Sequence, residues 1–126
     1  MSDEKLNAEI VSEADVARLV NTFYGKVRRD EILAPIFNSV IKDNWDRHLK
    51  IMTDFWSTIL LYTKTYKSDP MPKHLPLQLE SIHFERWLQL FKETIAELFE
   101  GQIALNAIKR ASSIAMIMKA VKGIKE

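Results

Sequence analysis

Three histidines are the side chains in this sequence best suited to bind a metal or move a proton. They are His48, His74 and His83, and their spacing matches no known zinc motif. The chain has no cysteine, which excludes disulfides, iron–sulfur clusters, thiolate-bound zinc and cysteine nucleophiles. It also has no glycine-rich phosphate loop and no nucleophile elbow. Nothing here is typical of a hydrolase or a nucleotide-binding enzyme.

His48 precedes Met52 by four residues and Phe55 by seven, so on a helix it shares a face with bulky apolar side chains. Two interpretations are open for it. One is a boundary histidine whose ring is half in water. The other is a histidine at the mouth of an apolar cavity.

The other two histidines compete for the role of a metal ligand. His74 lies in the segment PKHLPL, residues 72–77, which is bounded by prolines. It is either a solvated loop residue or an axial ligand held on a stiffened segment, because proline leaves less backbone freedom to lose. The leucines of that segment would then pack on a flat hydrophobic ligand. His83, four residues before Trp87, is the rival candidate.

Tyr24 and Trp87 each place one hydrogen-bond donor at the edge of an apolar stripe. They are either ordinary core residues whose polar tips reach a backbone carbonyl, or donors that point into a cavity. A buried hydroxyl or indole N–H without a partner is costly. If both point into a cavity, a ligand with acceptor lone pairs is expected there.

The elements that must position these side chains are helices. The chain has 126 residues, enough for one domain, with only three Gly but three Trp, three Tyr and six Phe, and its apolar residues recur at helical spacing. The pattern predicts an all-α domain over residues 1–126, with residues 1–11 as a flexible extension. The first expected helix opens at Ser12, with Asp15 as a capping partner, and its apolar stripe extends to Val27. A shorter helical stretch over 30–41 is broken by Pro35, and a third helix starts near Asp43 or Asn44 and runs to about 62. The last two expected helices cover about 81–99, with Gly101 as terminator, and about 102–121.

Between the third and fourth of these helices, residues 63–78 contain three prolines and no periodicity. Long ordered loops of this kind are often functional. Charge is nearly balanced, with 18 basic and 17 acidic residues, and the basic residues near the C-terminus lie at helical spacing without aromatic residues between them. We therefore expect a solvated helix face and no nucleic-acid partner. Because the first ten residues contain no apolar run and no transmembrane span is visible, we also expect no membrane partner and a cytoplasmic protein.

Taken together, the sequence resembles the truncated haemoglobins of group III. The resemblance covers about residues 12–120 and depends on the order and spacing of several segments. They are FYGKVR at 23–28, PIFN at 35–38, WDRH at 45–48 with FW at 55–56, KHL at 73–75 and FERWL at 84–88. The Gly-Gly pairs typical of other truncated groups are absent, which fits group III.

The resemblance implies a shortened globin fold, two helices packed on two, around one haem b (iron protoporphyrin IX). It makes His74 the iron ligand and disfavours His83. It places Tyr24, His48 and Trp87 on the distal side, where gas ligands bind. The remaining haem contacts that it implies are Phe23, Phe37, Met52, Phe55 and Leu77.

The function implied is the binding of O2 and other small ligands, namely NO, CO or peroxide, by a bacterial protein that is a monomer or weak dimer. A polar distal pocket slows ligand release, which favours NO or peroxide chemistry with an external electron donor over bulk oxygen delivery. Two alternatives are a gas sensor and a haem-free globin-like interaction module.

Overall fold

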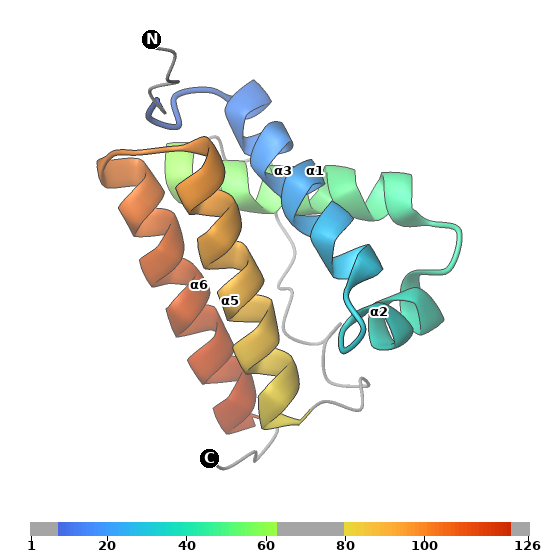
Figure 1. The fold of residues 1–126 in the computed structure, drawn as a ribbon. Helices are drawn as coiled ribbons and strands as arrows, with labels where there is room; N and C mark the ends of the chain where they lie inside the picture. Colours follow the sequence, from blue (N-terminus) through green and yellow to red (C-terminus); the bar gives the residue numbers. More distant parts are fainter. Residues whose placement is uncertain (1–7, 63–79, 122–126) are drawn as a thin grey trace, which may run out of the picture.

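The computed structural model describes residues 8–62 and 80–121, and this part of the chain folds into five α-helices without a named strand. The helices are α1 (Glu13–Arg29), α2 (Ala34–Ile41), α3 (Trp45–Leu61), α5 (Ser81–Leu98) and α6 (Gln102–Val121). Helix α1 crosses α3, while α5 runs antiparallel beside α6, and α1 also packs on α5 (Figure 1). The expected all-α class, with two helix pairs packed on each other, is confirmed. No helix in the described ranges is long and apolar enough to cross a membrane.

Helix α1 begins where the sequence predicts. The Ser12 hydroxyl accepts a hydrogen bond from the Asp15 N–H (3.2 Å), and the Asp15 carboxylate accepts one from the Val11 N–H (2.9 Å). The first bond satisfies a backbone donor that a helix start leaves open, and the second ties the residue before the cap to the first turn. Its buried residues are Val16, Leu19, Val20, Phe23, Tyr24 and Val27. This apolar stripe holds α1 against α3 and α5.

The short helix after α1 differs from the prediction at its start. It begins only at Ala34, and Pro35 lies in its first turn instead of breaking it. Proline is well suited to that position, because its missing N–H would have no helical partner there and its φ is already helical. Residues 31–33 form a turn, in which the Asp30 carboxylate accepts the N–H groups of Ile32 and Leu33, both at 3.0 Å.

Gly101 also has another role than the expected one. Helix α5 ends at Leu98, before Gly101, whose carbonyl instead accepts the first hydrogen bond of α6, from the Leu105 N–H (3.0 Å). Its φ of +142° favours glycine, and a β-carbon there would collide with the carboxylate of Glu9. The glycine therefore serves the start of the last helix.

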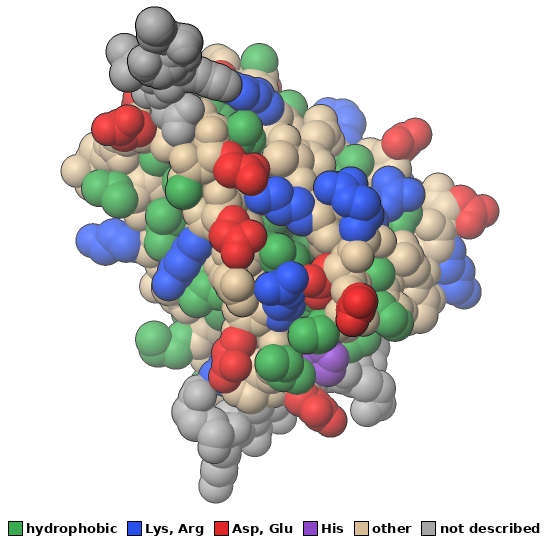
Figure 2. All heavy atoms as spheres, in the orientation of Figure 1, with side chains coloured by type: hydrophobic (Ala, Val, Ile, Leu, Met, Phe, Trp, Pro, Cys, Tyr) green, Lys and Arg blue, Asp and Glu red, His purple; other side chains and the backbone are tan. Residues whose placement is uncertain are grey.

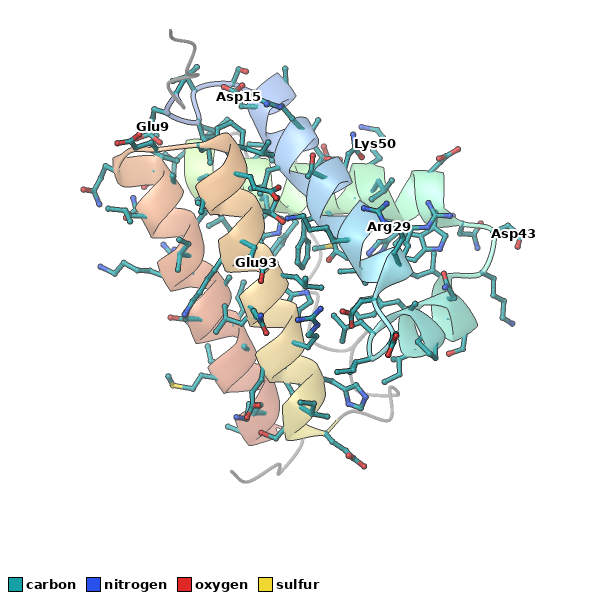
Figure 3. All side chains as sticks on the ribbon, viewed as in Figure 1. Glu9, Asp15, Arg29, Asp43, Lys50 and Glu93 are labelled. Carbon is teal, nitrogen blue, oxygen red and sulfur yellow. The ribbon has the colours of Figure 1, made fainter. Side chains whose placement is uncertain are left out.

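The described part of the N-terminal stretch packs against the domain, whereas residues 1–11 were predicted to be a flexible extension. Ala8 forms a bridge with Phe99, and Ile10 is fully buried. The Glu9 carboxylate accepts the N–H groups of Ile103 (2.8 Å) and Ala104 (3.0 Å) in the first turn of α6 (Figure 3). A carboxylate in this place satisfies open donors and complements the helix dipole.

Replacing Glu9 by glutamine is expected to lower the free energy of unfolding by about 1 kcal/mol at neutral pH, because the amide keeps only one of the two acceptor oxygens and loses the charge that complements the helix dipole. Burial alone would raise the pKa of the Glu9 carboxyl, but the backbone N–H groups of Ile103, Ile10 and Ala104 lower it below its ordinary value of 4.5. Because the folded pKa is the lower one, this stabilisation is present above the unfolded pKa and is lost as the pH falls through the folded pKa.

Denaturant titrations at pH 7 and at successively lower pH would measure both effects. Glu100→Gln changes a neighbouring exposed carboxylate and is the matched control. An equal loss of stability in the two variants, or an unchanged pH dependence in Glu9→Gln, would contradict the capping role.

Candidate functional site

The centre of the candidate site is Tyr24, which points inward from the second half of α1. Only 3% of this residue is exposed. Its ring lies against four other aromatic rings from α1, α2 and α3. The ring centroids lie at 4.8 Å for Phe23, 5.1 Å for His48, 6.1 Å for Trp45 and 6.2 Å for Phe37. Three helices therefore contribute aromatic rings around the buried ring of Tyr24.

The hydroxyl of Tyr24 is kept protonated. Burial raises the pKa of Tyr24 well above its ordinary value of 10.0, and a side-chain hydrogen bond with Trp87 opposes this only in part. The indole N–H of Trp87 can only donate, so the tyrosine oxygen is the acceptor in that bond. The O–H proton of Tyr24 is left to donate to another acceptor. Trp87 and Tyr24 thus form a short chain of donors that runs from α5 to α1.

His48 lies on the neighbouring helix α3 and is turned toward the same cluster. Its ring meets those of Tyr24 and Trp45 edge-on, at 5.1 and 5.6 Å, with interplanar angles of 88° and 90°. The side chain is partly exposed, yet its Nε2 atom is buried. The ring is thus partly exposed and lies beside the aromatic rings with one nitrogen buried, and both interpretations of His48 stay open.

Apolar side chains surround these polar groups. Phe23, Phe37 and Met52 are buried, and Phe55 is partly buried, with its ring 5.5 Å from that of Trp56. Trp87 stacks on Phe91 at 5.9 Å and 18°. The tyrosine hydroxyl and the indole N–H are therefore placed in a surrounding that is otherwise hydrocarbon, where hydrogen bonds are stronger than in water.

The predicted metal ligand His74 and the predicted contact Leu77 lie outside the described residues. The rival, His83, is described, and it has a structural role. Its Nδ1 accepts a hydrogen bond from the Glu80 N–H (2.8 Å) as part of a capping box at the start of α5. Among residues 8–62 and 80–121, no three His, Cys, Asp or Glu side chains are grouped to hold a metal ion.

Sequence reasoning did not include Trp45 among the site residues, although the structure places its ring beside those of both Tyr24 and His48, at 6.1 and 5.6 Å. Its indole N–H donates to the Asn38 side-chain oxygen (3.0 Å), and the Arg28 guanidinium lies 4.6 Å from its ring centroid. The signal was available, because Trp45 precedes His48 by three residues and so shares its helical face.

Charged side chains of both signs are mixed on the face drawn in Figure 2. Lys and Arg side chains are interspersed there with Asp and Glu, and no patch of one sign covers it.

The chain is similar to known bacterial globins over most of its length. A family model described as "Bacterial-like globin" matches residues 6–121. The chain is 34% identical to the group 3 truncated hemoglobin ctb of Campylobacter jejuni over 111 residues, and this aligned region covers 85% of this chain and 87% of that protein. It is 29% identical over 98 residues to the group 2 truncated hemoglobin YjbI of Bacillus subtilis, covering 75% and 74%. The crystal structure of the group III truncated hemoglobin from Campylobacter jejuni aligns with a TM-score of 0.85 at 32% identity, covering 92% of this chain and 94% of that one.

Proposed function

The chain belongs to the bacterial-like globin family, whose members hold haem, and we propose that it binds O2 and related small ligands against Tyr24, Trp87 and His48. In this proposal the haem is of the b type and its iron ligand is His74. The observation that carries the proposal is the buried Tyr24 hydroxyl, which lies in an aromatic cluster, accepts from Trp87 and retains a proton to donate.

The described residues fit the distal half of a haem site. Phe37, Met52 and Phe55 would give the flat apolar macrocycle its wall, with Phe23 behind them. When bound, haem would supply an iron able to take a diatomic ligand and to shift electron density onto it. The protonated hydroxyl of Tyr24 is the kind of donor that such a ligand requires.

Tyr24 and Trp87 would favour O2 over uncharged CO. A hydrogen bond to a charged group contributes about 1.5–3 kcal/mol. Trp87 would act either through Tyr24, which its N–H already contacts, or as a second direct donor. His48 would serve as a gate, as a third donor or as a transient sixth ligand to the metal.

Such donors slow the release of a ligand, which suits chemistry on NO or peroxide better than bulk oxygen delivery. The donors would hold the ligand in place and polarise it. The reducing electrons would come from a separate donor protein or small molecule.

The test is to purify the protein with haem supplied and to record absorption spectra in the ferric, ferrous and CO-treated ferrous states. We expect a strong Soret band, near-stoichiometric haem, and reaction with NO (oxygenated ferrous protein) and with peroxide (ferric protein) faster than free haem reacts. Failure in both reactions would remove the chemical part of the proposal. A colourless protein that takes up no haem would overturn the whole of it and favour an interaction module.

A further inference from the structure

A second polar contact joins the two helices that carry Tyr24 and Trp87, and the function proposed above does not use it. The Arg86 Nε atom donates to the Asp30 carboxylate at 2.6 Å, although the two residues are 56 positions apart. The side chain of Asp30 is only 5% exposed and that of Arg86 is 31% exposed. The pair is therefore shielded from water on its acidic side.

Asp30 is also the organising residue of the turn from α1 to α2. Its second carboxylate oxygen accepts the N–H groups of Ile32 and Leu33, and its carbonyl accepts the Ala34 N–H (2.9 Å). Burial by itself would raise the pKa of Asp30, but the Arg86 hydrogen bond, with those of Leu33 and Ile32, lowers it below its ordinary value of 3.8. The Asp30 carboxylate is thus held in its charged form by hydrogen bonds from Arg86, Ile32 and Leu33.

The position of this pair connects it to the donors. Arg86 is the residue directly before Trp87 on α5. Asp30 ends α1, which carries Tyr24, and its turn leads into α2, which carries Phe37, a ring neighbour of Tyr24. A shift of the pair would therefore change both the rotation of Trp87 and the position of Phe37 relative to the Tyr24 hydroxyl.

We propose that the Asp30–Arg86 pair is a positioning contact that sets Trp87 against Tyr24 and thereby tunes the hydrogen bonding offered to a gas ligand. The inference rests on the proposed function, because it requires these two donors to face the ligand. Neither residue of the pair touches the ligand. Both act through the geometry of the helices that they connect.

The chain contains a matched control for this idea. Lys26 and Glu97 also join α1 to α5, at 2.9 Å, but their side chains are 19% and 56% exposed. A pair with an exposed partner contributes little to stability. It also makes none of the turn contacts that Asp30 makes. Breaking it should leave the donors where they are.

The first test variant is Asp30→Asn. Asparagine keeps one oxygen to accept the Ile32 and Leu33 N–H groups, while its amide N–H₂ cannot pair with Arg86. The turn is thereby preserved and the ion pair is lost. The second variant, Arg86→Lys, keeps the positive charge but lacks the planar guanidinium group, so it should retain the contact with Asp30 only in part.

The measurements use the haem-loaded protein. In the CO-treated form they are the C–O stretching frequency, which responds to donors near the ligand, and the indole N–H chemical shift of Trp87. In the oxygenated form the measurement is the O2 dissociation rate. We expect Asp30→Asn to move both spectroscopic signals and to speed O2 release about threefold or more, as partial loss of a donor implies. Arg86→Lys should fall between that variant and the wild type, and Glu97→Gln should match the wild type. In a Trp87→Phe background, Asp30→Asn should add little further change.

Two results would overturn the inference in different ways. If Tyr24→Phe shifts the C–O frequency but Asp30→Asn and Arg86→Lys leave all three signals unchanged, the pair is only structural, whatever it contributes to unfolding stability. If Tyr24→Phe itself leaves the C–O frequency unchanged, the proposed distal site is wrong and this inference falls with it.

Discussion

Replacement of His74 by alanine is expected to remove the protein's hold on haem iron. The variant purified with haem should lose its Soret band or show it strongly shifted, and its haem content should fall from near-stoichiometric to a small fraction. The reason is that an imidazole supplies the one strong bond between a globin and its iron. Absorption spectra and haem extraction, compared with the wild type, would measure the change.

His83→Ala is the control that makes this result specific. His83 caps the start of α5 through its Nδ1 atom, so its loss should cost about 1 kcal/mol of stability and leave the haem spectrum intact. If His83→Ala were the variant with the damaged spectrum, haem binding would stand, but the assignment of His74 would be wrong.

Tyr24→Phe is expected to raise the O2 dissociation rate about tenfold or more. The change removes a single hydroxyl and keeps the ring that packs on Phe23 and Phe37. Loss of a hydrogen bond to a charged acceptor is worth at least about 1.4 kcal/mol, which is a factor of ten. CO, which gains little charge, should dissociate at nearly the wild-type rate. Stopped-flow mixing of the oxygenated protein with CO would give the O2 rate.

Trp87→Phe and the double variant extend this measurement. Because the Trp87 N–H donates to Tyr24, the two losses should be coupled, and their combined effect should be smaller than the sum of the single effects. Tyr62→Phe, which changes a tyrosine that is 78% exposed, is the matched control and should have no effect. Wild-type O2 release from Tyr24→Phe would rule out Tyr24 as the main donor.

The helices were predictable because their apolar residues repeat at helical spacing along nearly the whole chain. Errors arose where one residue type permits two roles. A proline such as Pro35 can end one helix or begin another, and a glycine such as Gly101 can follow one helix or precede the next. The residues at which these helices begin and end therefore depend on neighbours outside the local pattern. The role of Glu9 was hidden for a related reason, since its partners Ile103 and Ala104 lie at the other end of the sequence.

The sequence pattern identified some residues of the candidate site and missed others. Tyr24, Trp87 and His48 were singled out because each puts a polar group on an apolar stripe, and the structure brings them together. Trp45 could have been added from its helical spacing to His48. The Asp30–Arg86 pair could not, because nothing local in the sequence joins an acidic residue to a basic one on a distant helix. His74 stays a prediction from the family resemblance.

The placement of the tryptophans gives the molecule an optical property. Trp56 and Trp87 both stack on Phe91, Trp45 lies against Tyr24, and the chain has only these three tryptophans. Every indole fluorophore is therefore packed within or beside the aromatic cluster, at short range for energy transfer to a chromophore held there. Tryptophan fluorescence should be weak while that chromophore is bound and strong once it leaves, so the release of the chromophore can be followed in the unlabelled protein.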